Sequence, residues 1–196
     1  MNWSRAVHHV EAAADECQRL QELPPTMVPV RVTQMWVFGD ALGPARDLET
    51  VSLALSLDLP AEDVAWLTEP PAATHWLNMT RLAKNPVRVW WRSARAPVWN
   101  HRIAHPLLVW SSADGVVDDA MNALREGRGE AAGLTEPSAD ELATRLRQEL
   151  AISLSTLRAR SEDYGAKRWG QGKLEPTADA LWHVAHGYLD LLDAQS

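Results

Sequence analysis

The spacing of apolar residues changes between helical and strand periods along the first third of the chain. Apolar residues recur every three or four positions over residues 4–23, which predicts an amphipathic helix that Pro24-Pro25 ends. Residues 30–38 are mostly β-branched or aromatic and predict a strand. A second strand is predicted over residues 49–59, because its larger apolar side chains share one parity. The chain is thus expected to begin with one helix and two strands.

The centre of the chain alternates short apolar runs with prolines and glycines. These runs are too short for long helices, so the elements predicted here are brief. They are helices over residues 61–67, 72–83 and 116–126, and strands over residues 87–91 and 107–111.

Two long amphipathic helices are predicted at the C-terminal end. Ser138 and Glu141 have the spacing of a capping box, and they open a helix that is expected to end near residue 164. Pro176 can occupy the first turn of a last helix that reaches about residue 193 and has Trp182 on its apolar face.

The order of these elements predicts an α+β protein. Its small sheet of three to four strands would be flanked by the N-terminal helix and by a helical C-terminal layer. We expect an α+β core over residues 1–127 and the helical layer over residues 138–196, packed as one compact unit. Three long amphipathic helices around so small a sheet also make a homodimer an option.

Composition narrows the class of protein. The 196 residues include ten tryptophans but one phenylalanine and two tyrosines, so tryptophan occupies most aromatic positions. No stretch approaches the ~20 apolar residues that a membrane span needs. The start of the chain lacks the pattern of a secretory signal, and Cys17 is the single cysteine. We therefore expect a cytoplasmic protein without membrane association.

Charge is unevenly distributed along the chain. The net charge of −7 argues against general nucleic-acid binding. Residues 81–113, however, contain no Asp or Glu and carry six Arg and Lys side chains among four tryptophans. Arginine and tryptophan together can stack on rings and bind carboxylates or phosphates. The segment predicts a site for an anionic small ligand or an acidic partner surface, with the candidate residues Arg88, Trp90, Trp91, Arg92, Arg95, Trp99 and Arg102.

The alternative interpretation of the same segment is structural. Its tryptophans would fill a core that lacks other aromatic residues. The aliphatic parts of the arginine side chains would pack over these rings, and their guanidinium groups would be solvated or paired with acids. Since side chains alternate along a strand, Trp90 and Trp91 must point to opposite faces. We expect one of these two rings to be partly accessible, close to Arg88 or Arg92 and lining the main cleft.

The turn between the first two predicted strands carries a cluster of acidic residues. Phe38-Gly39-Asp40 ends one strand and Asp47-Leu48-Glu49 opens the next. In this order of elements, residues 30–58 resemble the small nucleotidyltransferase fold. The resemblance implies that Asp47 and Glu49 would bind Mg²⁺ and a nucleoside triphosphate, which requires two side chains on one face of a strand. Asp40 stands where that family has serine, and Glu49 replaces its second aspartate; the alternative is a turn with solvated acids.

A polar stripe on the last predicted helix is a candidate metal site. It consists of Asp179, His183, His186 and Asp190, which recur at helical spacing on one side of the apolar face. Two imidazoles and two carboxylates can ligate zinc or another transition metal. The alternative, which we favour, is a solvated flank of the helix with no metal.

Two segments resemble an uncharacterised family of actinobacterial proteins. They are LAKNPVRVWWRSARAPVWNHRI and GKLEPTADALW, and the resemblance implies no particular activity. The sequence contains no nucleophile elbow, phosphate loop or dinucleotide fingerprint. Our leading hypothesis is therefore a non-catalytic binding or regulatory protein without a cofactor. A Mg²⁺-dependent nucleotidyltransferase-like enzyme and a purely structural interaction protein are the alternatives.

Overall fold

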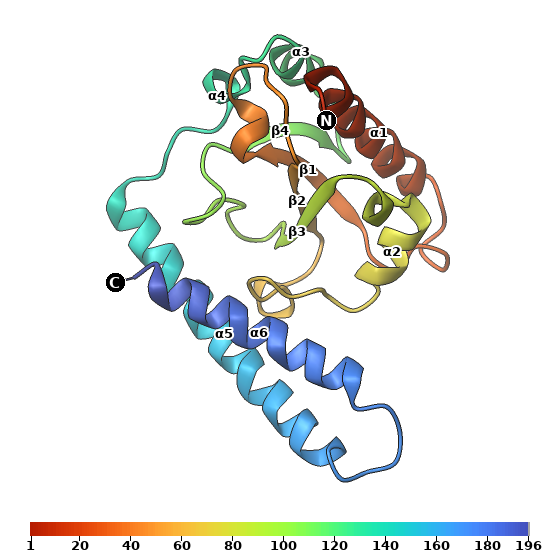
Figure 1. Ribbon diagram of the computed structural model, residues 1–196, viewed down its shortest axis with the longest axis vertical. Coiled ribbons are helices and arrows are strands. Elements are labelled where there is room, and N and C mark those ends of the chain that lie inside the picture. Colours follow the sequence, from red (N-terminus) through yellow and green to blue (C-terminus); the bar gives the residue numbers. More distant parts are fainter. Residues whose placement is uncertain (196) are drawn as a thin grey trace.

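A five-stranded mixed sheet lies at the centre of the computed structural model, which describes residues 1–195 (Figure 1). Its order is β3-β2-β1-β4-β5, with β2 and β3 parallel and the other neighbours antiparallel. The predicted α+β class is confirmed, and the sheet exceeds the expected three to four strands because a two-residue β5 adds to β4. The strands are β1 (Val32–Phe38), β2 (Val51–Leu57), β3 (Val87–Ser93), β4 (Leu107–Ser111) and β5 (Gly115–Val116).

Helices precede, interrupt and follow the strands. No helix within residues 1–195 is both long enough and apolar enough to cross a membrane. The α-helices are α1 (Trp3–Gln21), α2 (Ala73–Thr80), α3 (Asp118–Arg125), α4 (Gly129–Ala132), α5 (Ala139–Lys167) and α6 (Glu175–Asp193). Short 3₁₀ turns are η1 (Gly39–Leu42), η2 (Ala61–Asp63) and η3 (Leu82–Lys84).

The prediction of a helix over residues 61–67 is wrong beyond the first turn. Only η2 forms there, and the chain then continues without regular structure to α2. Leu67 has a φ of 58°, a left-handed conformation that an α-helix cannot contain. This irregular segment carries Trp66 into the core next to the candidate site.

The larger core lies between the sheet and α1, α2 and α3. Val51, Leu53, Leu55 and Leu57 of β2 are fully buried on this face, as their shared parity predicted. Trp91 of β3 joins the same core, where its ring meets the ring of Trp76 edge-on at 5.8 Å. This face of β3 is therefore packed against the helices of the larger core.

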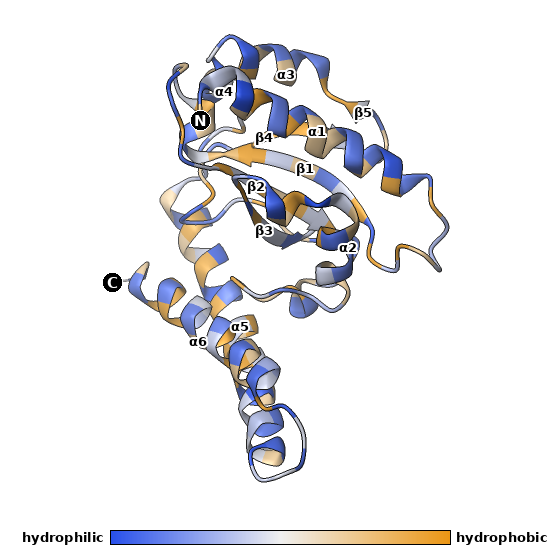
Figure 2. Ribbon diagram, turned by 45° about the vertical axis from the view of Figure 1, so that its right-hand side comes forward, coloured by the Kyte–Doolittle hydropathy of each residue, from blue (hydrophilic) through white to orange (hydrophobic). Residues whose placement is uncertain are grey.

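A smaller core lies on the opposite face of the sheet. Trp36, Phe38 and Ala54 from the strands meet Leu146 of α5 and Leu191 of α6. The helices α5 and α6 form a hairpin whose far end extends away from the sheet (Figures 1 and 2). The C-terminal helical layer is thus anchored to the sheet at one end of the hairpin.

The capping box at the start of α5 forms as predicted. Ser138 Oγ accepts a hydrogen bond from the Glu141 amide, and Glu141 accepts one from the Ser138 amide. The helix continues to Lys167 instead of ending near residue 164. Gly165 is exposed, and no atom from outside its own stretch of helix lies within 4 Å of the place that a Cβ would take, so the helix tolerates it at a cost of only about 1 kcal/mol.

Candidate binding groove

A cavity of about 460 Å³ separates β3 from α6. We call it the Trp90 groove. Aromatic and aliphatic side chains supply most of its walls, with one arginine, one glutamate and two histidines among them. Its lining residues are Trp66, Leu67, Thr68, Glu69, Leu77, Ala83, Val87, Arg88, Val89, Trp90, Trp91, Trp182, His183 and His186.

The groove runs along the open edge of the sheet. β3 is the terminal strand, and its consecutive residues 87–91 all line the groove. Val87, Val89 and Trp91 pack on the side of α1 and α2, whereas Trp90 packs on the side of the hairpin. Successive side chains of a strand point to opposite faces of the sheet. A cavity lined by side chains from both faces of β3 must therefore follow the outer edge of that strand.

Trp90 forms the centre of the groove on the hairpin side. Its half-buried ring packs against Trp66 at 5.0 Å between centroids and meets Phe38 edge-on at 5.6 Å. The indole nitrogen of Trp90 is buried and has no hydrogen-bond acceptor among the described residues. Trp91 is buried, so the prediction that one of the two rings is partly accessible, near Arg88, is confirmed for Trp90. The expectation that this ring lines the main cleft is wrong, because the larger cavity of about 960 Å³ lies beside residues 59–74 and does not include Trp90.

The opposite wall belongs to α6. Trp182 is 60% exposed, and its ring stacks on the ring of His186 with 5.2 Å between centroids. Large exposed aromatic rings beside a cavity are typical of binding surfaces. The sequence predicts Trp182 on the apolar face of its helix, yet the structure places it at the rim of the groove.

The groove has a guanidinium without an ion pair at the start of β3, and one carboxylate, that of Glu69, elsewhere in its lining. Arg88 is exposed and forms no ion pair within residues 1–195. Arg81 and Lys84 nearby in sequence are also exposed and free of ion pairs in this part of the chain. The lining carboxylate of Glu69 accepts a hydrogen bond from Thr74 Oγ1. Arg88 is therefore the guanidinium available to a ligand in the groove.

Arg92 serves a different purpose from the one predicted. Its guanidinium is buried and forms an ion pair with Glu149 of α5, while its Cζ lies 5.2 Å from the Trp66 ring centroid. Arg145 pairs with the same carboxylate at 2.9 Å, and Asn100 donates to its second oxygen at 2.9 Å. This buried network joins β3 to the hairpin and leaves Arg92 without a free face for a ligand.

The remaining candidates of the Arg/Trp segment lie outside the groove. Arg95 forms an exposed ion pair with Asp58 at 3.0 Å, and Arg102 pairs with Asp190. Trp99 is half-buried and does not line the groove. The structure thus brings together Arg88, Trp90 and Trp91 from the predicted set.

Asp190 anchors α6 to the body of the molecule. It accepts hydrogen bonds from Trp66 Nε1 at 2.9 Å, from His101 Nε2 at 2.7 Å and from Arg102 Nε at 3.1 Å. Burial opposes its charge, but donation by Arg102, Trp66 and His101 outweighs that cost and lowers the pKa of Asp190 to about 2. Both oxygens of Asp190 are therefore occupied by this contact.

Asp190→Asn is expected to reduce the acid sensitivity of the fold. A carboxyl whose pKa is lowered by folding stabilises the protein above its unfolded pKa and loses that effect as the pH falls through the folded value. The wild type should lose about 2 kcal/mol more than the variant between pH 4 and pH 2. Urea unfolding across this range measures the difference. Asp193→Asn, an exposed change on the same helix, is the control; equal losses in all three proteins would contradict the assignment.

The predicted metal stripe does not assemble as a metal site. Within residues 1–195 no three His, Cys, Asp or Glu side chains are placed to hold an ion together. His183 and His186 line the Trp90 groove, Asp179 and His183 line the neighbouring larger cleft, and Asp190 is held by its three donors. The two histidines therefore contribute to the groove as exposed polar side chains.

The expectation that Asp47 and Glu49 share one face of a strand is wrong. β2 begins at Val51, and both acids are exposed in the preceding loop. The reason lies at Leu48, whose backbone bonds to Met1 in both directions, with N–O distances of 2.9 and 2.6 Å, instead of to a neighbouring strand. Asp40 of the same turn forms an ion pair with Arg46 at 2.6 Å.

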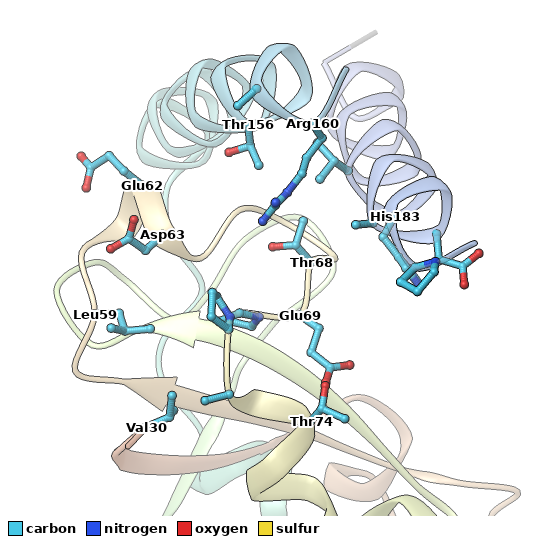
Figure 3. Close-up of a pocket in the computed structure, with 18 of the residues that line it drawn as sticks. Val30, Leu59, Glu62, Asp63, Thr68, Glu69, Thr74, Thr156, Arg160 and His183 are labelled. Atoms are coloured by element: carbon cyan, nitrogen blue, oxygen red, sulfur yellow. The ribbon is translucent and has the colours of Figure 1, made fainter. Parts of the chain in front are cut away.

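A larger cleft of about 960 Å³ lies between the hairpin and residues 59–74 (Figure 3). Arg160 reaches from α5 toward Thr68 in this cleft, and it pairs with Asp163 at 3.2 Å. Glu62 and Asp63 stand on the facing wall. Because its one arginine is already paired and the wall is acidic, this cleft suits an anion less well than the Trp90 groove.

Comparison with known proteins gives a family without an activity. The family model described as domain of unknown function (DUF7711) matches residues 1–196. The chain belongs to the DUF7711 family. This agrees with the predicted membership of an uncharacterised family. No curated protein and no solved structure matches the chain.

Sequence reasoning missed part of the groove in this DUF7711 protein. Trp66 lies in a segment for which the sequence predicts a helix, and the helical period places Trp182 on a buried face. One signal for Trp182 was available, since it precedes His186 by one helical turn and a stacked pair at that spacing is common on exposed faces. No local signal connects Trp66 with Trp90, because the contact depends on the fold.

Proposed function

We propose that the protein is a non-catalytic binding protein that holds an anionic ligand or an acidic partner surface in the Trp90 groove. The observation that carries the proposal is Arg88, an exposed guanidinium without an ion pair in the described chain, on the wall of an aromatic cavity. Arginine recognises carboxylates and phosphates with paired donors, and tryptophan faces can stack on an adjoining ring or apolar group. The cavity volume is in the range of ligand sites.

The other polar groups of the groove support the same class of ligand. His183 and His186 face Arg88 across the groove and add further donors. An oxygen-rich anion would provide acceptors for these groups.

Arg88→Gln is expected to weaken binding of an acidic chain by about tenfold, since one charge-assisted contact is lost. The probe is poly-L-glutamate, and the readout is the ¹⁵N–¹H indole signals of Trp90 and Trp182. Arg95→Gln is the matched control, because it removes the same charge from the same segment but from an exposed pair that contributes little.

Three results would contradict the proposal. They are indole signals of Trp90 and Trp182 that do not move with poly-L-glutamate, equal losses in the Arg88→Gln and Arg95→Gln variants, and equal shifts with poly-L-lysine. Incubation with labelled nucleoside triphosphates and Mg²⁺ distinguishes the enzyme alternative: turnover that disappears in Asp47→Asn and Glu49→Gln would replace the binding function with nucleotidyl transfer.

A further inference from the structure

We infer that the occupant of the Trp90 groove is an extended acidic peptide that adds as a sixth strand to the open edge of β3. The inference rests on the proposed function and specifies its partner and binding mode. Strand addition to an exposed sheet edge is a general mode of peptide recognition, in which main-chain hydrogen bonds supply affinity and alternate side chains supply specificity.

The backbone of β3 presents unpaired groups on its outer side. Val51 N donates to Pro86 O, and Ala94 N donates to Leu57 O, so even-numbered residues of β3 bond to β2. Residues of the other parity must turn their N–H and C=O groups outward. The amides and carbonyls of Val89 and Trp91 have no hydrogen-bond partner within residues 1–195. These four groups form a ready template for another strand.

The two sides of this edge differ in chemistry. On the side of α2, an added strand would face Leu77, Ala83 and Val89, which are all apolar. On the side of α6, it would face Arg88 and the polar edges of His183 and His186. Because side chains of a strand alternate between its faces, the matching peptide alternates apolar and acidic residues.

Charge favours an acidic peptide over a second copy of this chain. Pairing of two β3 edges would bring Arg88 of each copy close to that of the other, with Arg81 and Lys84 also exposed in the same region. Like charges on adjoining strands are destabilising. A glutamate on the added strand would instead meet Arg88 as an opposite charge.

The probe that tests this is Glu-Val-Glu-Val-Glu-Val-amide with fluorescein on its N-terminal amine, measured by fluorescence anisotropy. Val89→Pro removes one outward N–H and leaves the bonds to β2 intact, a change that edge strands tolerate. Val89→Ala loses the same side chain but keeps the N–H, so it is the reference, and Val89→Pro should bind the peptide at least about tenfold more weakly than Val89→Ala does. Thermal unfolding verifies that both variants fold.

N-methylated peptides apply the same test to the unaltered protein. In an antiparallel addition the valine amides face β3, and in a parallel addition the glutamate amides face it. Methylation of one set should therefore abolish binding and methylation of the other should preserve it, which also gives the strand direction. The charge-reversed Lys-Val peptide should not bind.

The outcomes separate the two proposals. Strand addition is overturned if Val89→Pro binds the peptide as well as Val89→Ala does, or if both methylated peptides bind like the parent. If Arg88→Gln still weakens binding in that case, the anionic-ligand function stands with a different geometry. If the groove binds neither poly-L-glutamate nor the hexapeptide, both proposals are overturned.

Discussion

Glu149→Ala is expected to lower the free energy of unfolding by about 3–5 kcal/mol, because removing one partner of a buried ion network leaves its remaining charges uncompensated. Glu149 is 4% exposed and holds two buried guanidiniums, those of Arg92 and Arg145, together with the amide of Asn100. Without the carboxylate, two positive charges would face each other between β3 and α5. The hairpin should consequently loosen from the sheet at this point.

Urea unfolding followed by tryptophan fluorescence measures this effect. Glu162→Ala is the matched control, since it is the same change at an exposed position of α5 and should alter stability by no more than about 0.5 kcal/mol. Glu149→Gln keeps the shape but not the charge and should fall between the two. A Glu149→Ala variant as stable as the Glu162→Ala variant would show that the network does not hold the hairpin.

Gly187→Ala should displace α6 and lower stability by about 1–3 kcal/mol or more, as expected for overpacking against a rigid neighbour. A Cβ at Gly187 would lie 2.1 Å from the carbonyl oxygen of Trp66 and 3.0 Å from its carbon. Both atoms belong to the backbone, so no side chain can rotate to make room. Since Trp66 and α6 form two walls of the Trp90 groove, the same change should also widen the groove.

Gly165→Ala, on the neighbouring helix α5, is expected to raise stability instead of lowering it. No atom from outside its own stretch of helix lies within 4 Å of its Cβ position, and alanine favours a helix over glycine by about 1 kcal/mol, so this variant should be more stable than the wild type. Thermal unfolding and peptide affinity, measured on both variants, separate the two effects. A Gly187→Ala variant with wild-type stability and affinity would contradict the close contact between α6 and Trp66.

Elements that depend on local signals were predictable from the sequence. The capping box at Ser138, the helical period of α1 and the parity of β2 each act within a few residues, and each forms as expected. Strand alternation alone also predicted that one of the two rings Trp90 and Trp91 is partly accessible, although it did not tell which. These features need no knowledge of which segments become neighbours.

Features that depend on long-range pairing were not predictable. Arg88 and Arg92 belong to one strand and look alike in the sequence, yet Arg92 meets Glu149 across 57 positions while Arg88 meets no acid in the described chain. β3 is the terminal strand of the sheet and pairs only with β2, so the backbone groups on its outer side have no neighbouring strand. Asp47 and Glu49 lie outside β2 because the backbone of Leu48, between them, bonds to Met1, which precedes α1.

Amide hydrogen exchange along β3, measured by NMR with and without the Glu-Val hexapeptide, is the most direct test of strand addition. We predict that the outward amides of Val89 and Trp91 exchange at least about tenfold more slowly when the peptide is bound, since each gains a hydrogen bond. The amides of Arg88 and Trp90, which already bond to β2, should change little. Bound peptide with unchanged exchange at Val89 and Trp91 would contradict strand addition at this edge.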